Sequence, residues 1–333
     1  MDTNPNAPEA GDGARQRRRR SFAWLAKYGT LVGMVLMIVA FSLAAPGYFF
    51  TVSNFVNILN QASLTAIIAG GLTVAVIVGE LDLSIGYGAS FAGVLVTGLL
   101  VHNGLPILLA IVIVLGVSAL IGVVNGLIVS KLRVNSVIAT LGSGSIIVGM
   151  NYAYSTGAPI ATGVPEAFLN LSLGSSFGIP NNILIMLAVL TLLWLLVNRT
   201  ETGQRIRAVG GNIEAARLTG IRVDRIKILA FVVAAMAAGL TGILLASLIG
   251  SGTTTAADAY LLNSFAAVFL GSATLRDGEF HVPGTFIGVL IIGIGFNGLA
   301  IFGAPTFYQY VFQGGILIAA VGLSTVARRY ATR

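Results

Sequence analysis

Long apolar stretches separated by short polar breaks run along nearly the whole chain. A helix that spans a bilayer needs about 20 mostly apolar residues. This criterion predicts ten spans, at 26–45, 55–78, 85–102, 105–129, 134–154, 181–198, 228–249, 259–275, 283–302 and 308–326. Gly70-Gly71 and Gly86 leave the exact geometry of spans two and three open, as broken or re-entrant segments. The pattern predicts an all-α polytopic membrane protein.

The positions of the charges favour one orientation of these spans. When the N-terminus is assigned to the cytoplasm and the spans alternate, all 19 Lys and Arg fall in cytoplasmic segments. The positive-inside rule expects this distribution, so both termini are predicted in the cytoplasm. Residues 1–20, rich in Pro, Gly and Arg without an apolar period, are expected to be a disordered cytoplasmic tail. Residues 21–333 are expected to form the membrane domain.

The composition narrows the class of protein further. Hydrophobic residues make up 56% of the chain and charged residues only 9%, against roughly 25% charged in soluble domains. A soluble enzyme, a nucleic-acid binder and a disordered protein are therefore excluded. The chain has no cysteine, two isolated histidines and no glycine-rich phosphate loop of the G-x-x-x-x-G-K-[ST] type. We expect no metal site and no ATP bound by that loop in this chain.

Small residues recur at four-residue spacing in two of the predicted spans. One row is Ser118, Gly122, Gly126 and Ser130, and another is Gly284 and Gly288. Such rows let helix backbones approach closely. They predict tight helix packing rather than a direct role with a substrate.

The spans carry neutral polar side chains where a gradient-driven transporter would usually place charges. Candidates for a path through the membrane are Asn60, Gln61, Asn125, Thr140, Asn151, Asn263 and Asn297. Their amides and hydroxyls suit a neutral, hydroxyl-rich solute, and they equally suit ordinary hydrogen bonds between helices. A second candidate group, Glu80, Asp82 and Ser84, follows span two as a gating loop. Its two acids are expected either in an interfacial loop or helix cap, or as a buried functional pair.

The segment 199–227 stands apart, because 10 of its 29 residues are charged. Each charge would cost roughly 2.5–3.5 kcal/mol at the centre of a spanning helix, so the segment is expected to stay in the cytoplasm. Asn212 can cap a short helix that begins at Ile213, and Gly220 can end it. A short amphipathic helix lying along the membrane is a suitable docking element for a partner, although a passive charged connector is the alternative.

These residues resemble a known family. Glu214-Ala215-Ala216 followed by Gly220 is similar to the E-A-A-x-x-x-G loop of ABC-importer permeases, which receives the ATPase subunit. Residues 79–86, 137–142 and 284–299 resemble G-G-I-D-L-S-V-G, F-I-A-T-L-G and the ninth-helix motif of the ribose/xylose/arabinose permeases. Glu80 departs from this pattern, since it stands where a glycine is usual. Asn135-Ser136 and the residues at 277–281 depart from it as well.

The resemblance, which runs from about residue 45 to 326, implies a permease subunit of an ATP-driven monosaccharide or polyol importer in a bacterial plasma membrane. Its implied partners are a cytoplasmic ABC ATPase that carries the ATP and Mg²⁺, an extracytoplasmic sugar-binding protein and a second permease chain, expected to be an identical copy. The residues implied to meet the ATPase are Glu214, Ala215, Ala216, Arg217, Gly220 and Asp224. The rival interpretations are a secondary transporter driven by an ion gradient through Glu80 and Asp82, and a branched-chain amino acid permease.

Overall fold

The computed structural model describes residues 12–274 and 278–331, and they are mostly helical. In chain order the elements are α1 (Asp12–Ala44), α2 (Val52–Ile77), α3 (Ile85–Val101), α4 (Ile107–Ser130), α5 (Ser136–Ser155), α6 (Glu166–Leu173), β1 (Ser175–Ser176), β2 (Ile179–Pro180), α7 (Asn181–Arg199), α8 (Glu201–Gly211), α9 (Ile213–Leu218), α10 (Val223–Ile249), α11 (Asp258–Ser272), α12 (Val282–Ile301) and α13 (Phe307–Ala331). The predicted all-α membrane class is confirmed.

Each of the ten predicted spans coincides with one helix of the structure. Within the described residues, 6 of these helices are long and apolar enough to cross a membrane by length and composition. They are α2, α4, α5, α7, α10 and α12, and the apolar parts of α1 and α3 are shorter. Helix α1 begins at Asp12, inside the segment expected to be a disordered tail, because its Arg-rich stretch has good helix propensity and continues the helix backwards. Residues 1–11 of that tail lie outside the described residues.

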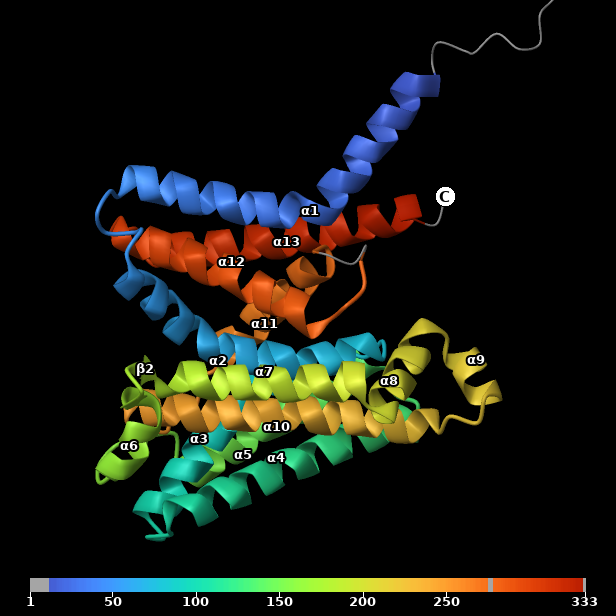
Figure 1. Cartoon of the computed structure of the whole chain (residues 1–333). Coiled ribbons are helices and arrows are strands. Elements are labelled where there is room, and N and C mark those ends of the chain that lie inside the picture. The colour runs from blue at the N-terminus through green and yellow to red at the C-terminus, as the bar shows by residue number, and fades with distance from the viewer. Residues whose placement is uncertain (1–11, 275–277, 332–333) are drawn as a thin grey trace, which may run out of the picture.

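The helices lie side by side in two groups, as Figure 1 shows. Helix α10 lies at the centre of the lower group, in contact with α2, α3 and α4, while α11 packs against α12, α13 and α2. Helix α2 therefore connects the two groups. The described start of α1, the end of α13 and the pair α8–α9 all lie toward the same end of the stack (Figure 1).

Small residues bring the central helices into direct backbone contact, as the four-residue spacing predicted. A Cβ on Gly122 would lie 2.6 Å from the Cα of Val232, and one on Gly126 would lie 2.6 Å from the Cα of Ile228. The glycine row of α4 therefore packs directly against the backbone of α10. Gly284 and Gly288 of α12 similarly meet the backbone of α11. The packing interpretation of both rows is confirmed.

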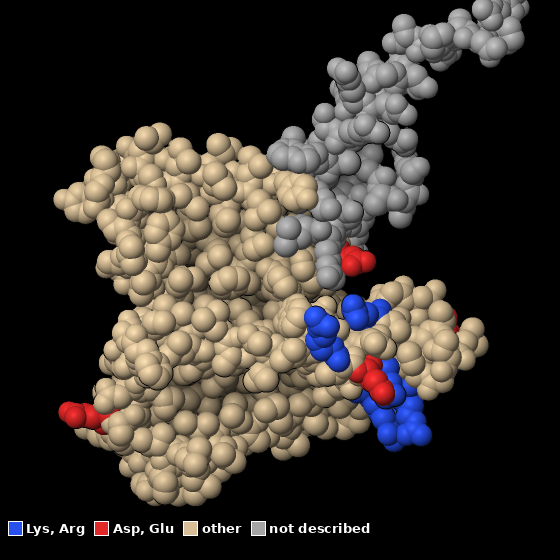
Figure 2. Space-filling view, viewed as in Figure 1, with Lys and Arg blue, Asp and Glu red and all other residues tan. Residues whose placement is uncertain are grey.

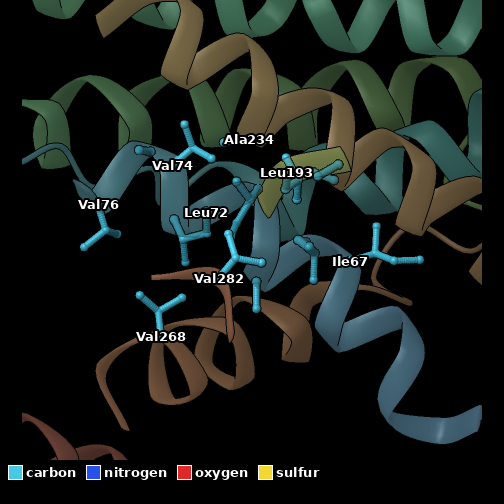
Figure 3. Packing of buried hydrophobic residues seen from close by; sticks show 14 of the residues in the cluster. Ile67, Leu72, Val74, Val76, Leu193, Ala234, Val268 and Val282 are labelled. Carbon is cyan, nitrogen blue, oxygen red and sulfur yellow. The ribbon is translucent and has the colours of Figure 1, made fainter. Parts of the chain in front are cut away.

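A single large apolar core connects α2, α7, α10, α11 and α12. Figure 3 shows part of it, with Ile67, Leu72 and Val74 of α2 beside Leu193, Ala234, Val268 and Val282 from the neighbouring helices. Ile67 and Leu72 are fully buried. This burial fixes α2 in place along most of its length, including the end that leads to the polar loop described below.

The segment between α5 and α7 contains structure that the sequence patterns did not predict. It forms the short helix α6 and the two-stranded hairpin β1–β2, in which Ser175 pairs with Pro180 and Ser176 with Ile179. Ile160 also forms a bridge with Gly252, which ties this segment to the connection after α10. The described Lys and Arg that are visible in Figure 2 gather at the opposite end of the molecule, near α8–α10.

Candidate functional site

The charged segment 199–227 folds into two helices rather than one. Thr200 caps the first of them, α8, because its Oγ1 accepts a hydrogen bond from the amide of Gly203 at 3.0 Å. Ile206 and Val209 of α8 are fully buried against the membrane helices. Helix α8 was missed by the sequence analysis, although Thr200 as a cap and the Glu201–Arg205 pair at i,i+4 spacing are signals that predict it.

The second helix, α9, is the one that the sequence predicted. The Oδ1 of Asn212 accepts a hydrogen bond from the amide of Ala215 at 3.0 Å and so caps its start. Gly220 has a φ of +81°, which suits glycine in the left-handed region, and its amide donates to the carbonyl of Arg217 at 2.9 Å. The cap at Asn212 and the end at Gly220 are confirmed.

Helix α9 buries Ala216, half-buries Ile213 and exposes its other side chains. Ala216 is 3% exposed, whereas Glu214, Ala215 and Arg217 face outward, with Glu214 and Arg217 paired at 3.3 Å. Leu218 is 90% exposed, the most of any large hydrophobic side chain on the charged segment. An apolar side chain in this position on a water-facing helix is a feature of a contact surface. Leu218 was not singled out from the sequence. Its position opposite Ala216 on an otherwise polar helix is a pattern that predicts its exposure.

The last of the predicted docking residues, Asp224, lies in the first turn of α10 rather than on α9. Its Oδ2 accepts a hydrogen bond from the Nζ of Lys131 at 2.7 Å, so it ties the first turn of α10 to the end of α4. Both side chains are substantially exposed, and such surface pairs contribute little to stability. Asp224 is therefore less directly available to a partner than the exposed face of α9.

The loop between α2 and α3 carries the predicted gating residues, and the structure buries both of its acids. Asp82 has no exposed surface, and Glu80 is 8% exposed. The Oδ1 of Asp82 accepts hydrogen bonds from the amide and the hydroxyl of Ser84, at 2.9 and 2.5 Å. Asp82 therefore contacts the residue that precedes α3 and is buried, whereas a functional role of the two acids stays a prediction. Burial raises the pKa of Asp82 to about 6, while the two bonds from Ser84 act in the opposite direction.

Two of the candidate path residues join the same loop. The Nδ2 of Asn125 donates to the hydroxyl of Ser84 at 3.0 Å, and the Oγ1 of Thr140 accepts from the amide of Leu83 at 3.0 Å. The Oγ of Ser136 also accepts from the amide of Leu81 at 3.3 Å. The loop is thereby held to α4 and α5 through a buried polar network.

Glu80 has a different partner. Its Oε1 accepts a hydrogen bond from the Nζ of Lys227, on the second turn of α10, at 2.5 Å. Beside this pair is a polar cavity of about 400 Å³. Its lining comes from the loop, the adjoining ends of α4 and α5, the end of α9 and the start of α10: Gly79, Glu80, Val129, Ser130, Arg133, Val134, Asn135, Ser136, Arg217, Val223, Asp224 and Lys227. The candidate gating loop and the candidate docking segment are therefore neighbours.

The remaining path candidates do not gather in one place. Asn297 exchanges two hydrogen bonds with Asn54 of α2, at 2.9 and 3.0 Å. Asn151 donates to the backbone carbonyl of Thr254 at 3.0 Å. Four of the seven candidates, counting Asn125 and Thr140, thus make contacts between segments, as the alternative interpretation expected. The other three keep their side chains half-buried or exposed: Asn60, Gln61 and Asn263.

One acid that the sequence analysis did not single out contacts another helix in the structure. Asp258 begins α11, and its Oδ1 accepts a hydrogen bond from Ser90, in the second turn of α3, at 3.0 Å. The same hydroxyl accepts from the amide of Ala257 at 3.0 Å. The chain after α10 therefore turns back along α3 before α11 starts. The signal for this residue was an isolated acid in an otherwise uncharged stretch.

Comparison with known proteins identifies relatives along most of the chain. The family model described as "Branched-chain amino acid transport system / permease component" matches residues 54–321. The ribose import permease protein RbsC of Escherichia coli (strain K12) is 35% identical over 92% of this chain and 95% of its own length. The corresponding protein of Bacillus subtilis (strain 168) is 34% identical over 92% of this chain and 95% of its own length.

A relative with another named sugar shows a similar likeness. The D-allose transport system permease protein AlsC of Escherichia coli (strain K12) is 32% identical over 89% of this chain and 91% of its own length. No solved structure matches the chain. Because the family model covers most of the chain and these relatives align along nearly all of it, the chain belongs to the family of branched-chain amino acid transport system permease components.

Proposed function

We propose that this protein is the membrane permease subunit of an ATP-driven bacterial importer for a monosaccharide or related polyol. The observation that carries the proposal is the identity of 35% with a ribose import permease along 92% of the chain. The protein is accordingly a multi-pass protein of the bacterial plasma membrane and a transport subunit rather than an enzyme.

The proposed topology has ten crossings with both termini in the cytoplasm. One observation supports it, together with a general rule. The described ends of the chain lie toward the same end of the stack as α8–α9, which is where the visible Lys and Arg gather (Figures 1 and 2). The positive-inside rule assigns that end to the cytoplasm.

The exposed face of α9 is the proposed contact for a cytoplasmic ABC ATPase. It offers Glu214, Ala215 and Arg217 around the exposed Leu218, on a helix whose ends are fixed by Asn212 and Gly220. An apolar anchor surrounded by charged side chains is the usual arrangement of a specific interface. ATP and Mg²⁺ would bind to that partner, a sugar-binding protein would deliver substrate on the opposite side, and a second permease chain would complete the path.

The gradient-driven rival makes Glu80 and Asp82 the ion-coupling site. The contact of Glu80 with Lys227 argues against this role, because the carboxylate is already neutralised by a fixed cation. Asp82 is likewise engaged with Ser84. A branched-chain amino acid substrate remains a second candidate, since the family model takes its description from that substrate class.

The test is purification of the tagged protein in mild detergent from its own membrane, with identification of the proteins that accompany it. We expect an ABC ATPase to accompany the wild type and to be lost from Glu214→Lys. The matched control is Glu201→Lys, which reverses an acid of the same exposure class on α8 and should keep the ATPase. Uptake of labelled ribose and leucine into reconstituted vesicles then decides the substrate class. Uptake that stops when ion gradients are dissipated while ATP is present would overturn the proposal.

A further inference from the structure

The ion pair of Glu80 and Lys227 is largely shielded from water. The side chains are 11% and 17% exposed, respectively, and the Nζ donates to the Oε1 at 2.5 Å. Removal of one partner from such a pair leaves an uncompensated charge in a poorly solvated place, whereas removal of both does not. The contact is therefore much more firmly defined than the exposed pair of Lys131 and Asp224 nearby.

Lys227 lies in the helix that comes after the proposed docking helix in the chain. Helix α9 ends at Leu218, and the amide of Ile221 donates back to the carbonyl of Ala216 at 3.1 Å. Helix α10 begins at Val223, two residues after Ile221, and its Val223 and Ile226 are buried. Because this connection is short and hydrogen-bonded, a displacement of α9 must also move the first turns of α10.

Glu80, the other partner of the ion pair, belongs to the loop between α2 and α3. The amide of Glu80 donates to the carbonyl of Ala75 at 3.0 Å, which fixes it to the end of α2. The residues that follow it hold Asn125 of α4 and both Ser136 and Thr140 of α5 through the bonds described above. A force on the Glu80 carboxylate therefore acts on the loop that organises the ends of α2, α3, α4 and α5.

Part of the space between these two sides is open rather than filled by packed side chains. The polar cavity of about 400 Å³ lies there, with Arg217 of α9 and Ser136 of α5 both in its wall. Close packing would transmit a displacement in every direction. Across this cavity, within the described residues, Glu80–Lys227 is the shielded polar contact that joins the start of α10 to the loop.

We propose that the Glu80–Lys227 ion pair is the positioning contact that transmits movement of the ATPase-docking helix to the α2–α3 loop. The pair thereby sets how many substrate molecules pass for each ATP hydrolysed. This inference rests on the proposed function. It assigns Glu80 and Lys227 a role in coupling, and it assigns neither residue to the docking surface nor to the substrate path.

The experiment uses the complete complex of permease, ATPase and binding protein in vesicles, and measures substrate uptake and ATP hydrolysis together. Glu80→Gln and Lys227→Gln are expected to keep the ATPase bound and to lower the ratio of uptake to hydrolysis at least tenfold. The exchanged pair, Glu80→Lys with Lys227→Glu, should restore the ratio to within about threefold of wild type. Glu201→Gln on α8 is the matched control and should leave the ratio unchanged.

A double variant, Glu80→Gln with Lys227→Gln, covers the case in which a single variant fails to fold. It leaves no unpaired buried charge, and we expect it to assemble normally with an uncoupled ratio. An unchanged ratio in this double variant, or single-variant losses that the exchanged pair does not relieve, would overturn the inference. If no ATPase accompanies the wild-type chain, the proposed function itself fails and the inference with it.

Discussion

Gly210 of α8 lies directly against the backbone carbonyl of Ile77, the last residue of α2. No side chain fits between them, because a Cβ on Gly210 would overlap that carbonyl oxygen. Its neighbour Gly211 has nothing within 4 Å of the corresponding position. The charged segment therefore meets α2 at this close backbone approach, and Gly203 of α8 similarly lies against the backbone of α7.

This contact predicts different effects for two neighbouring substitutions. Gly210→Ala should destabilise the protein by about 1–3 kcal/mol, the usual cost of overpacking. Gly211→Ala should be neutral or slightly stabilising, since alanine favours a helix over glycine. Thermal unfolding of the two purified variants in the same detergent measures the difference. Equal melting temperatures would show that α8 is not seated on α2 in this way.

A second prediction concerns the exposed Leu218. Leu218→Ser should change the stability by less than about 0.5 kcal/mol, because the side chain is 90% exposed and touches little of its own chain. The amount of co-purified ATPase should fall at least tenfold, as expected for an interface anchor worth about 1.4 kcal/mol or more. The control is Leu173→Ser, at the end of α6 and 60% exposed, which should leave the ATPase bound. An ATPase retained by Leu218→Ser would move the contact away from this face of α9.

Gly220 supplies a third prediction through its backbone. Because its φ is +81°, a β-branched residue is strained there, whereas asparagine tolerates this region better. Gly220→Val should therefore disturb the end of α9 and reduce uptake, and Gly220→Asn should retain more of it. Nothing lies within 4 Å of the Cβ position, so the difference reports conformation rather than a collision. Uptake assays on the two variants at equal membrane levels provide the comparison, and equal activity would contradict this account.

The sequence predicted local features better than distant contacts. The helix from Ile213 needed only a capping residue and a glycine at its end, and the rows at Gly122 and Gly288 needed only their spacing. The burial of Asp82 and the partner of Glu80 depend on segments far apart in the chain, which no local pattern records. The contact of Asp258 with Ser90 was not predicted for the same reason, because the return of the chain along α3 is set by tertiary packing.

Asp82 supplies the last prediction, which concerns pH. Its pKa in the folded protein is raised to about 6 from an ordinary value of 3.8. Between these two values the folded state binds a proton that the unfolded state has released, so stability falls as the pH rises through this window. Above this window, the raised pKa lowers the free energy of unfolding by about 3 kcal/mol.

Asp82→Asn removes this titration while its amide oxygen can still accept a hydrogen bond from Ser84. The melting temperature of wild type relative to Asp82→Asn should therefore decrease between about pH 4 and 6 and stay level above that range. A relative melting temperature that rises over the same interval would mean that the folded protein favours the charged carboxylate, and that the bonds from Ser84 outweigh burial.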